Sequence, residues 1–70
     1  GSFARVYRAA SVEDGRIVGI KLLRQRWASD ARIVGLFRRE GELGKRLKHK
    51  NIVPIYDVVS EGNKHYFTME

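Results

Sequence analysis

The chain has 70 residues, enough for one small domain at most, and a domain of this size buries only about 60% of the surface that its unfolded chain exposes. Lysine and arginine number 14 against 8 acidic residues, and the net charge of +6 favours anionic partners such as nucleotides or nucleic acid. The chain has no cysteine and 2 histidines, which excludes disulfides and thiolate zinc sites, argues against a metal site, and fits a reducing, cytoplasmic location. No apolar run reaches the roughly 18 residues of a spanning helix, so no membrane segment is expected.

The first half of the chain predicts an antiparallel pair of strands. Residues 5–10 are rich in valine, tyrosine and alanine, and residues 16–23 are apolar and β-branched except at Gly19 and Lys21. Between them, the sequence Glu-Asp-Gly at residues 13–15 supplies the positive φ of a hairpin turn. Alternation along the second strand places Gly19 and Lys21 on the same face, so a lysine stands in an otherwise apolar strand.

A helix is predicted from a cap at Ser29 or Asp30 to about Lys48. The apolar residues at helical spacing, which we expect to face the sheet, are Ile33, Leu36, Phe37, Leu43 and Leu47. Three glycines, at positions 35, 41 and 44, each cost roughly 1 kcal/mol relative to alanine, so this helix must depend on packing.

The last third of the chain predicts two more strands. Residues 51–59 form the first, in which Pro54 indicates an edge position because proline cannot donate to a ladder on both sides. Residues 60–63 form a turn, and residues 64–69 return as the last strand. The order strand, strand, helix, strand, strand predicts an α+β fold with an antiparallel sheet and one packed helix.

One charged residue interrupts the apolar stripe of the predicted helix. Glu40 lies three residues after Phe37 and three before Leu43, so we expect it in the middle of the face turned to the sheet. A carboxylate there requires a cation, and Lys21 is the cationic residue inside the apolar strand. The sequence therefore predicts a Lys21–Glu40 pair across the interface of helix and sheet.

These parts, in this order, resemble the N-terminal lobe of a protein kinase. Residues 1–6, Gly-Ser-Phe-Ala-Arg-Val, are similar to the second half of the glycine-rich loop GxGxxGxV. Residues 18–21, Val-Gly-Ile-Lys, resemble the motif VAIK, and Glu40 corresponds to the glutamate of the αC helix. Residues 47–53 are similar to the family's L-x-H-P-N-I-V before the fourth strand, and residues 66–70 to the strand that ends in the gatekeeper and the first hinge residue.

The resemblance covers the whole chain and is strongest to bacterial Ser/Thr kinases of the eukaryotic type. It implies that residues 1–70 are part of a kinase domain, from the glycine-rich loop to the hinge, truncated at both ends. The implied function is to bind ATP and, once joined to the C-terminal lobe, to transfer its γ-phosphate to protein hydroxyls. The catalytic aspartate, the Mg²⁺ ligands and the protein-substrate site would lie in that second lobe, so no metal ligand is expected here.

The same resemblance implies roles for individual residues. The residues expected to contact ATP are Gly1, Ser2, Phe3, Ala4, Val6, Gly19, Lys21, Met69 and Glu70. Backbone N–H groups of residues 1–4 would cover the phosphates, and Val6 would lie with Gly19 against adenine. Lys21 would hold the α- and β-phosphates while Glu40 fixes its position, so these two are the expected catalytic residues. Met69 would close the back of the adenine pocket and the Glu70 carbonyl would accept from the adenine amino group.

The chain departs from the family's pattern at three positions. Ala4 replaces the third glycine of the loop, and Gly19 replaces the alanine of VAIK, which removes a methyl group from the adenine ceiling. Gly44 stands one turn after Glu40, where a bulky apolar residue normally stacks toward the second lobe. These departures keep open a kinase-shaped module without catalysis.

An alternative from another class is a nucleic-acid-binding module. Its basic residues on the predicted helix would be Arg38, Arg39, Lys45, Arg46 and Lys48, with aromatic residues stacking on bases. This alternative needs neither the glycines nor Glu40, and the aromatic residues lie in segments that also need a core. We therefore expect no nucleic-acid partner. Local alternatives also stay open, because Lys21 could extend to solvent and Glu40 could lie at the rim of the helix face.

Overall fold

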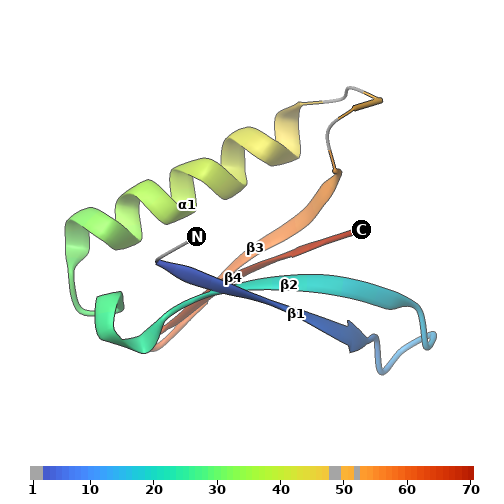
Figure 1. The fold of residues 1–70 in the computed structure, drawn as a ribbon, viewed down its shortest axis with the longest axis horizontal. Coiled ribbons are helices and arrows are strands. Elements are labelled where there is room, and N and C mark those ends of the chain that lie inside the picture. The colour runs from blue at the N-terminus through green and yellow to red at the C-terminus, as the bar shows by residue number, and fades with distance from the viewer. Residues whose placement is uncertain (1–2, 48–49, 52) are drawn as a thin grey trace.

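The computed structural model describes residues 3–47, 50–51 and 53–70. The elements in chain order are strand β1 (Ala4–Ala10), strand β2 (Ile17–Leu23), the short 3-10 helix η1 (Gln25–Trp27), helix α1 (Ala31–Arg46), strand β3 (Ile55–Glu61) and strand β4 (Lys64–Met69). This is the α+β arrangement of one sheet and one packed helix that the sequence predicts (Figure 1).

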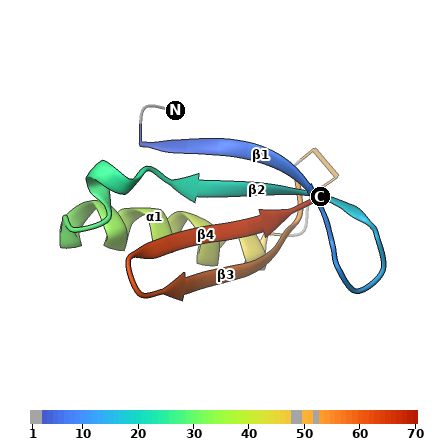
Figure 2. The ribbon, with the colours of Figure 1, turned by 90° about the horizontal axis from the view of Figure 1, so that it is seen from below.

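The four strands form one antiparallel sheet in the order β1-β2-β4-β3. Figure 2 shows the strands side by side in this order, with α1 along one face. Strand β2 is therefore an inner strand, and its Lys21 has Val6 of β1 and Phe67 of β4 as register partners. Strand β3 forms one edge, in agreement with the position of Pro54 directly before it.

Two of the predicted boundaries in the second half are wrong. The strand expected over residues 51–59 runs instead over Ile55–Glu61. The turn is correspondingly short, because Gly62 adopts a positive φ of 61° and the pairs Ser60–His65 and Glu61–Lys64 continue the ladder up to it. In the first hairpin, Gly15 takes the expected positive φ, here 74°.

Asp30 is the N-cap of helix α1, which settles the choice between the two candidate caps. The Asp30 side chain accepts hydrogen bonds from the backbone N–H groups of Arg32 at 3.0 Å and Ile33 at 3.3 Å. The helix ends at Arg46, earlier than the expected end at Lys48, which lies outside the described residues.

The core lies between α1 and the sheet, and its buried residues are Ala4, Leu23, Phe37 and Phe67. Leu36, Leu43 and Leu47 were expected to face the sheet, and this is wrong, because they are 64%, 47% and 54% exposed. The helix instead turns Gly41 and Gly44 toward β3 and β4. A count of apolar side chains misses this face, since glycine contributes backbone contact without a side chain.

Candidate ATP site

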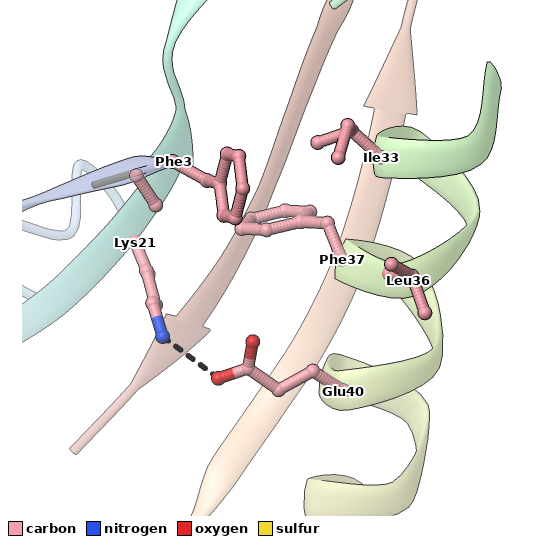
Figure 3. A pocket seen from close by; sticks show the side chains of 7 residues that line it. Phe3, Lys21, Ile33, Leu36, Phe37 and Glu40 are labelled. Carbon is pink, nitrogen blue, oxygen red and sulfur yellow. Dashed lines mark hydrogen bonds and ion pairs between the residues drawn. The ribbon is translucent and has the colours of Figure 1, made fainter. Parts of the chain in front are cut away.

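Lys21 and Glu40 form an ion pair, with 2.7 Å between Lys21 Nζ and Glu40 Oε2 (Figure 3). Lys21 comes from the inner strand β2 and Glu40 from the middle of α1, so the predicted pair between sheet and helix is confirmed. The position of Glu40 differs from the expectation. Its side chain is 54% exposed and lies at the rim of the helix face, whereas the Lys21 side chain is 26% exposed.

Lys21 also contacts an aromatic ring of the neighbouring strand β4. Its Nζ lies 5.6 Å from the centroid of the Phe67 ring, within the range of a cation–π contact. Phe67 is itself buried and packs against Phe37 of α1, with 4.9 Å between ring centroids. The ammonium group is therefore confined between an aromatic face and a carboxylate, with further N–H donors available to an anion.

A cavity of about 330 Å³ surrounds this pair. Its lining residues are Phe3, Ala4, Lys21, Ile33, Leu36, Phe37 and Glu40. Figure 3 shows Phe3, Ile33 and Phe37 gathered above the ion pair. A mostly apolar wall with one ion pair strengthens the electrostatic attraction for an anion that enters beside Lys21.

A second hollow, of about 380 Å³, brings together the residues expected around adenine. Val6, Gly19 and Glu70 all line it. Met69 packs beside it, because a Cβ atom at Gly19 would lie 3.0 Å from Met69 Cγ. Val6 is 66% exposed, so it forms an apolar wall of this hollow, and the side opposite this wall is open to solvent. Since Val6 is also the register partner of Lys21, the hollow follows the first cavity along the same two strands.

The described site residues thus form two groups, and Phe3 and Ala4 share the first cavity with Lys21 and Glu40. Gly1 and Ser2 lie outside the described residues. Within the described ranges, no three acidic or histidine side chains gather into a group that could hold a metal ion. No helix in these ranges is long and apolar enough to cross a membrane.

No pattern in the sequence indicated a contact between Phe3 and Trp27. Their rings meet edge to face, with 5.0 Å between centroids. A second unexpected link joins α1 to the β3–β4 hairpin, where Arg38 Nη1 donates to Ser60 Oγ and Ser60 Oγ lies 2.8 Å from His65 Nδ1. Both are contacts between distant segments, which periodicity cannot reveal.

The chain belongs to the protein kinase family, since the profile of the protein kinase domain matches residues 1–70. Two relatives are the serine/threonine-protein kinase PrkC of Bacillus subtilis (strain 168), 41% identical over 70 residues, and the CBL-interacting protein kinase 12 of Oryza sativa subsp. japonica, 40% identical over 70 residues. Each match covers 100% of this chain, but only 11% of PrkC and 13% of the rice protein.

The fold is also similar to that of a kinase domain of known structure. The crystal structure of the kinase domain of PknI from Mycobacterium tuberculosis, a double mutant, matches with a TM-score of 0.76 and 23% sequence identity, over 100% of this chain and 28% of that chain. The chain is therefore the N-terminal portion of a kinase domain, with relatives among Ser/Thr protein kinases. Bacterial relatives are among the matches, as the resemblance implied, and plant kinases match at similar identity.

Proposed function

We propose that these residues form the ATP-binding N-terminal part of a Ser/Thr protein kinase domain. The full-length kinase transfers the γ-phosphate of ATP to hydroxyl groups of protein substrates. The observation that carries the proposal is the Lys21–Glu40 ion pair, which stands in a cavity between the start of β1 and α1. A lysine placed in an apolar strand costs stability unless an anion holds it, and the free donors of this ammonium group point to a second anion.

Lys21 binds and orients the α- and β-phosphates in this proposal. Glu40 accepts one hydrogen bond and thereby limits the rotamers of a side chain that would otherwise be flexible. Such positioning lowers the entropic part of the barrier, and positioning together with electrostatic stabilisation makes up most of what a protein contributes to phosphoryl transfer.

The hollow beside Gly19 fits an adenine ring. Val6 supplies an apolar contact, and the backbone of Glu70 lies close to Gly19, with 3.8 Å between the Glu70 carbonyl oxygen and a Cβ atom built at Gly19. That carbonyl can accept a hydrogen bond from the adenine amino group. Mg²⁺ would neutralise charge on the phosphates, and its protein ligands are expected in the C-terminal lobe together with the protein-substrate site.

A kinase-shaped module without catalysis is the second candidate, because Ala4 and Gly19 depart from the family's pattern. Such a module would keep the fold of Figure 1 and the Lys21–Glu40 pair without supporting transfer. Nucleic-acid binding is less well supported, since Arg38 is already engaged by Ser60. We place the protein in the cytoplasm, on the basis of its cysteine-free composition.

The test is phosphoryl transfer by the full-length protein and its Lys21→Met variant, with ATP, Mg²⁺ and a generic protein substrate. Lys45→Met, which removes a lysine from the exposed side of α1, is the matched control. We expect transfer by the wild-type protein and Lys45→Met, and none by Lys21→Met, with all three folded. Transfer by Lys21→Met at the original rate contradicts the proposal. ATP binding by a wild-type protein that transfers nothing identifies the non-catalytic module.

A further inference from the structure

Phe3 is held by the segment that connects β2 to α1. Its ring meets Trp27 at an interplanar angle of 79°, with 5.0 Å between centroids, which is the edge-to-face arrangement that aromatic pairs favour. Its carbonyl oxygen also accepts a hydrogen bond from the backbone N–H of Arg24 at 2.8 Å. The residue directly before β1 is therefore fixed twice to one short connector.

Trp27 is anchored in turn to the body of the domain. It packs against the buried core cluster of Ala4, Leu23, Phe37 and Phe67. Its indole Nε1 is buried and finds no hydrogen-bond partner in the part of the chain that the structure describes. A buried donor without a partner is unfavourable, so the apolar ring and not the polar N–H explains what this side chain does here.

Phe3 contacts Trp27 and also faces the Lys21–Glu40 ion pair. It lines the cavity of Lys21 and Glu40 and remains 44% exposed, and Figure 3 shows its ring above the ion pair. The connector that holds Phe3 is the same one that leads from the strand of Lys21 to the helix of Glu40. The contact between Phe3 and Trp27 thus links the start of β1 to the connector between β2 and α1, and these three elements border the cavity.

We infer that Trp27 is a positioning residue for the nucleotide: it holds the Phe3 ring over the cavity of Lys21 and Glu40, where this ring can contact bound ATP. This inference rests on the proposed function. An aromatic ring that is already in place loses less conformational freedom when the nucleotide binds, so the contact strengthens ATP binding without taking part in the chemistry.

The experiment compares full-length variants by direct ATP binding and by steady-state kinetics. Trp27→Leu and Phe3→Leu each remove one ring, Trp27→Phe keeps a ring and removes the unpartnered N–H, and Tyr56→Leu is the control for loss of an aromatic residue elsewhere in the sheet. We expect each of the first two to raise the Kd and the KM for ATP about two- to tenfold, and Trp27→Leu to leave kcat unchanged. The double variant should be no worse than either single variant, and Trp27→Phe and Tyr56→Leu should resemble the wild type.

Unchanged ATP affinity in Trp27→Leu overturns the inference, and so does tighter binding, which would mean that the contact holds the Phe3 ring away from the nucleotide. If Trp27→Leu fails to fold, Trp27→Met, which removes the ring but keeps a large apolar side chain, takes its place in the same comparison. Failure of the proposed function looks different, since the wild-type protein itself would then bind no ATP.

Discussion

Gly44 of α1 packs directly against Ile55 at the start of β3. A Cβ atom at position 44 would overlap Ile55 Cδ1 and lie 3.2 Å from Ile55 Cγ1. Gly44 was expected to mark a missing apolar contact toward a second lobe, and that expectation stays a prediction, while the structure shows a different role for Gly44 within the described residues. The absence of a side chain is what allows α1 to approach the edge strand.

The first prediction follows from this contact. Gly44→Leu in the full-length protein should destabilise the fold by about 1–3 kcal/mol, because the added side chain forces Ile55 or the helix to move. Urea denaturation measures the change. A gain in stability would show that α1 can shift to present a leucine elsewhere, and would contradict the close packing of Gly44 against Ile55.

Two other glycines of α1 provide a matched pair. At Gly35 an added Cβ meets nothing within 4 Å, so Gly35→Ala should stabilise the protein by about 1 kcal/mol through helix propensity. At Gly41 the same atom would lie 2.7 Å from Val58 Cγ2 and 3.0 Å from Phe67 Cδ1, so Gly41→Ala should destabilise it. Melting temperatures of the two variants should move in opposite directions, and equal shifts would contradict the packing of Gly41.

The sequence predicted the ion pair because each partner is a charge in an apolar pattern, and such a pattern is visible without a structure. It could not predict which face of α1 meets the sheet, since Gly41 and Gly44 contribute close approach and no hydrophobicity. The polar run at residues 60–63 suggested a loop, but Ser60 and Glu61 pair with β4 because Gly62 alone makes the turn possible.

The third prediction separates stability from activity at Glu40. The Glu40 side chain is more than half exposed, so solvent screens the pair and Glu40→Gln should cost less than about 1 kcal/mol of stability. The same change should lower kcat/KM about ten- to hundredfold, because Lys21 loses its charged partner. Glu42→Gln, on the same helix, is the control and should change neither quantity. A loss of stability without a loss of transfer would assign the pair a purely structural role.

The fourth prediction concerns the 70-residue chain prepared alone. It should show no phosphoryl transfer and at most weak ATP affinity, because the described residues provide one wall of the adenine hollow and no cluster of metal ligands. Incubation with labelled ATP, Mg²⁺ and a protein substrate tests this. Transfer above background by the pure chain would require a catalytic group that the proposal lacks.

The last prediction is that the same isolated chain self-associates. Strand β1 is an outer strand of the described sheet, so one row of its N–H and C=O groups has no neighbouring strand within the described residues. Exposed apolar side chains add a second surface that favours association, namely Leu36 and Leu43 of α1 and Leu47 directly after it. Sedimentation velocity should show species larger than the monomer as concentration rises. Leu43→Lys with Leu47→Lys should reduce them without lowering the melting temperature, since neither side chain belongs to the buried core.

Amide exchange should be faster in β1 and α1 than in β4, which lies between two strands, and equal protection of α1 and β4 would contradict this account.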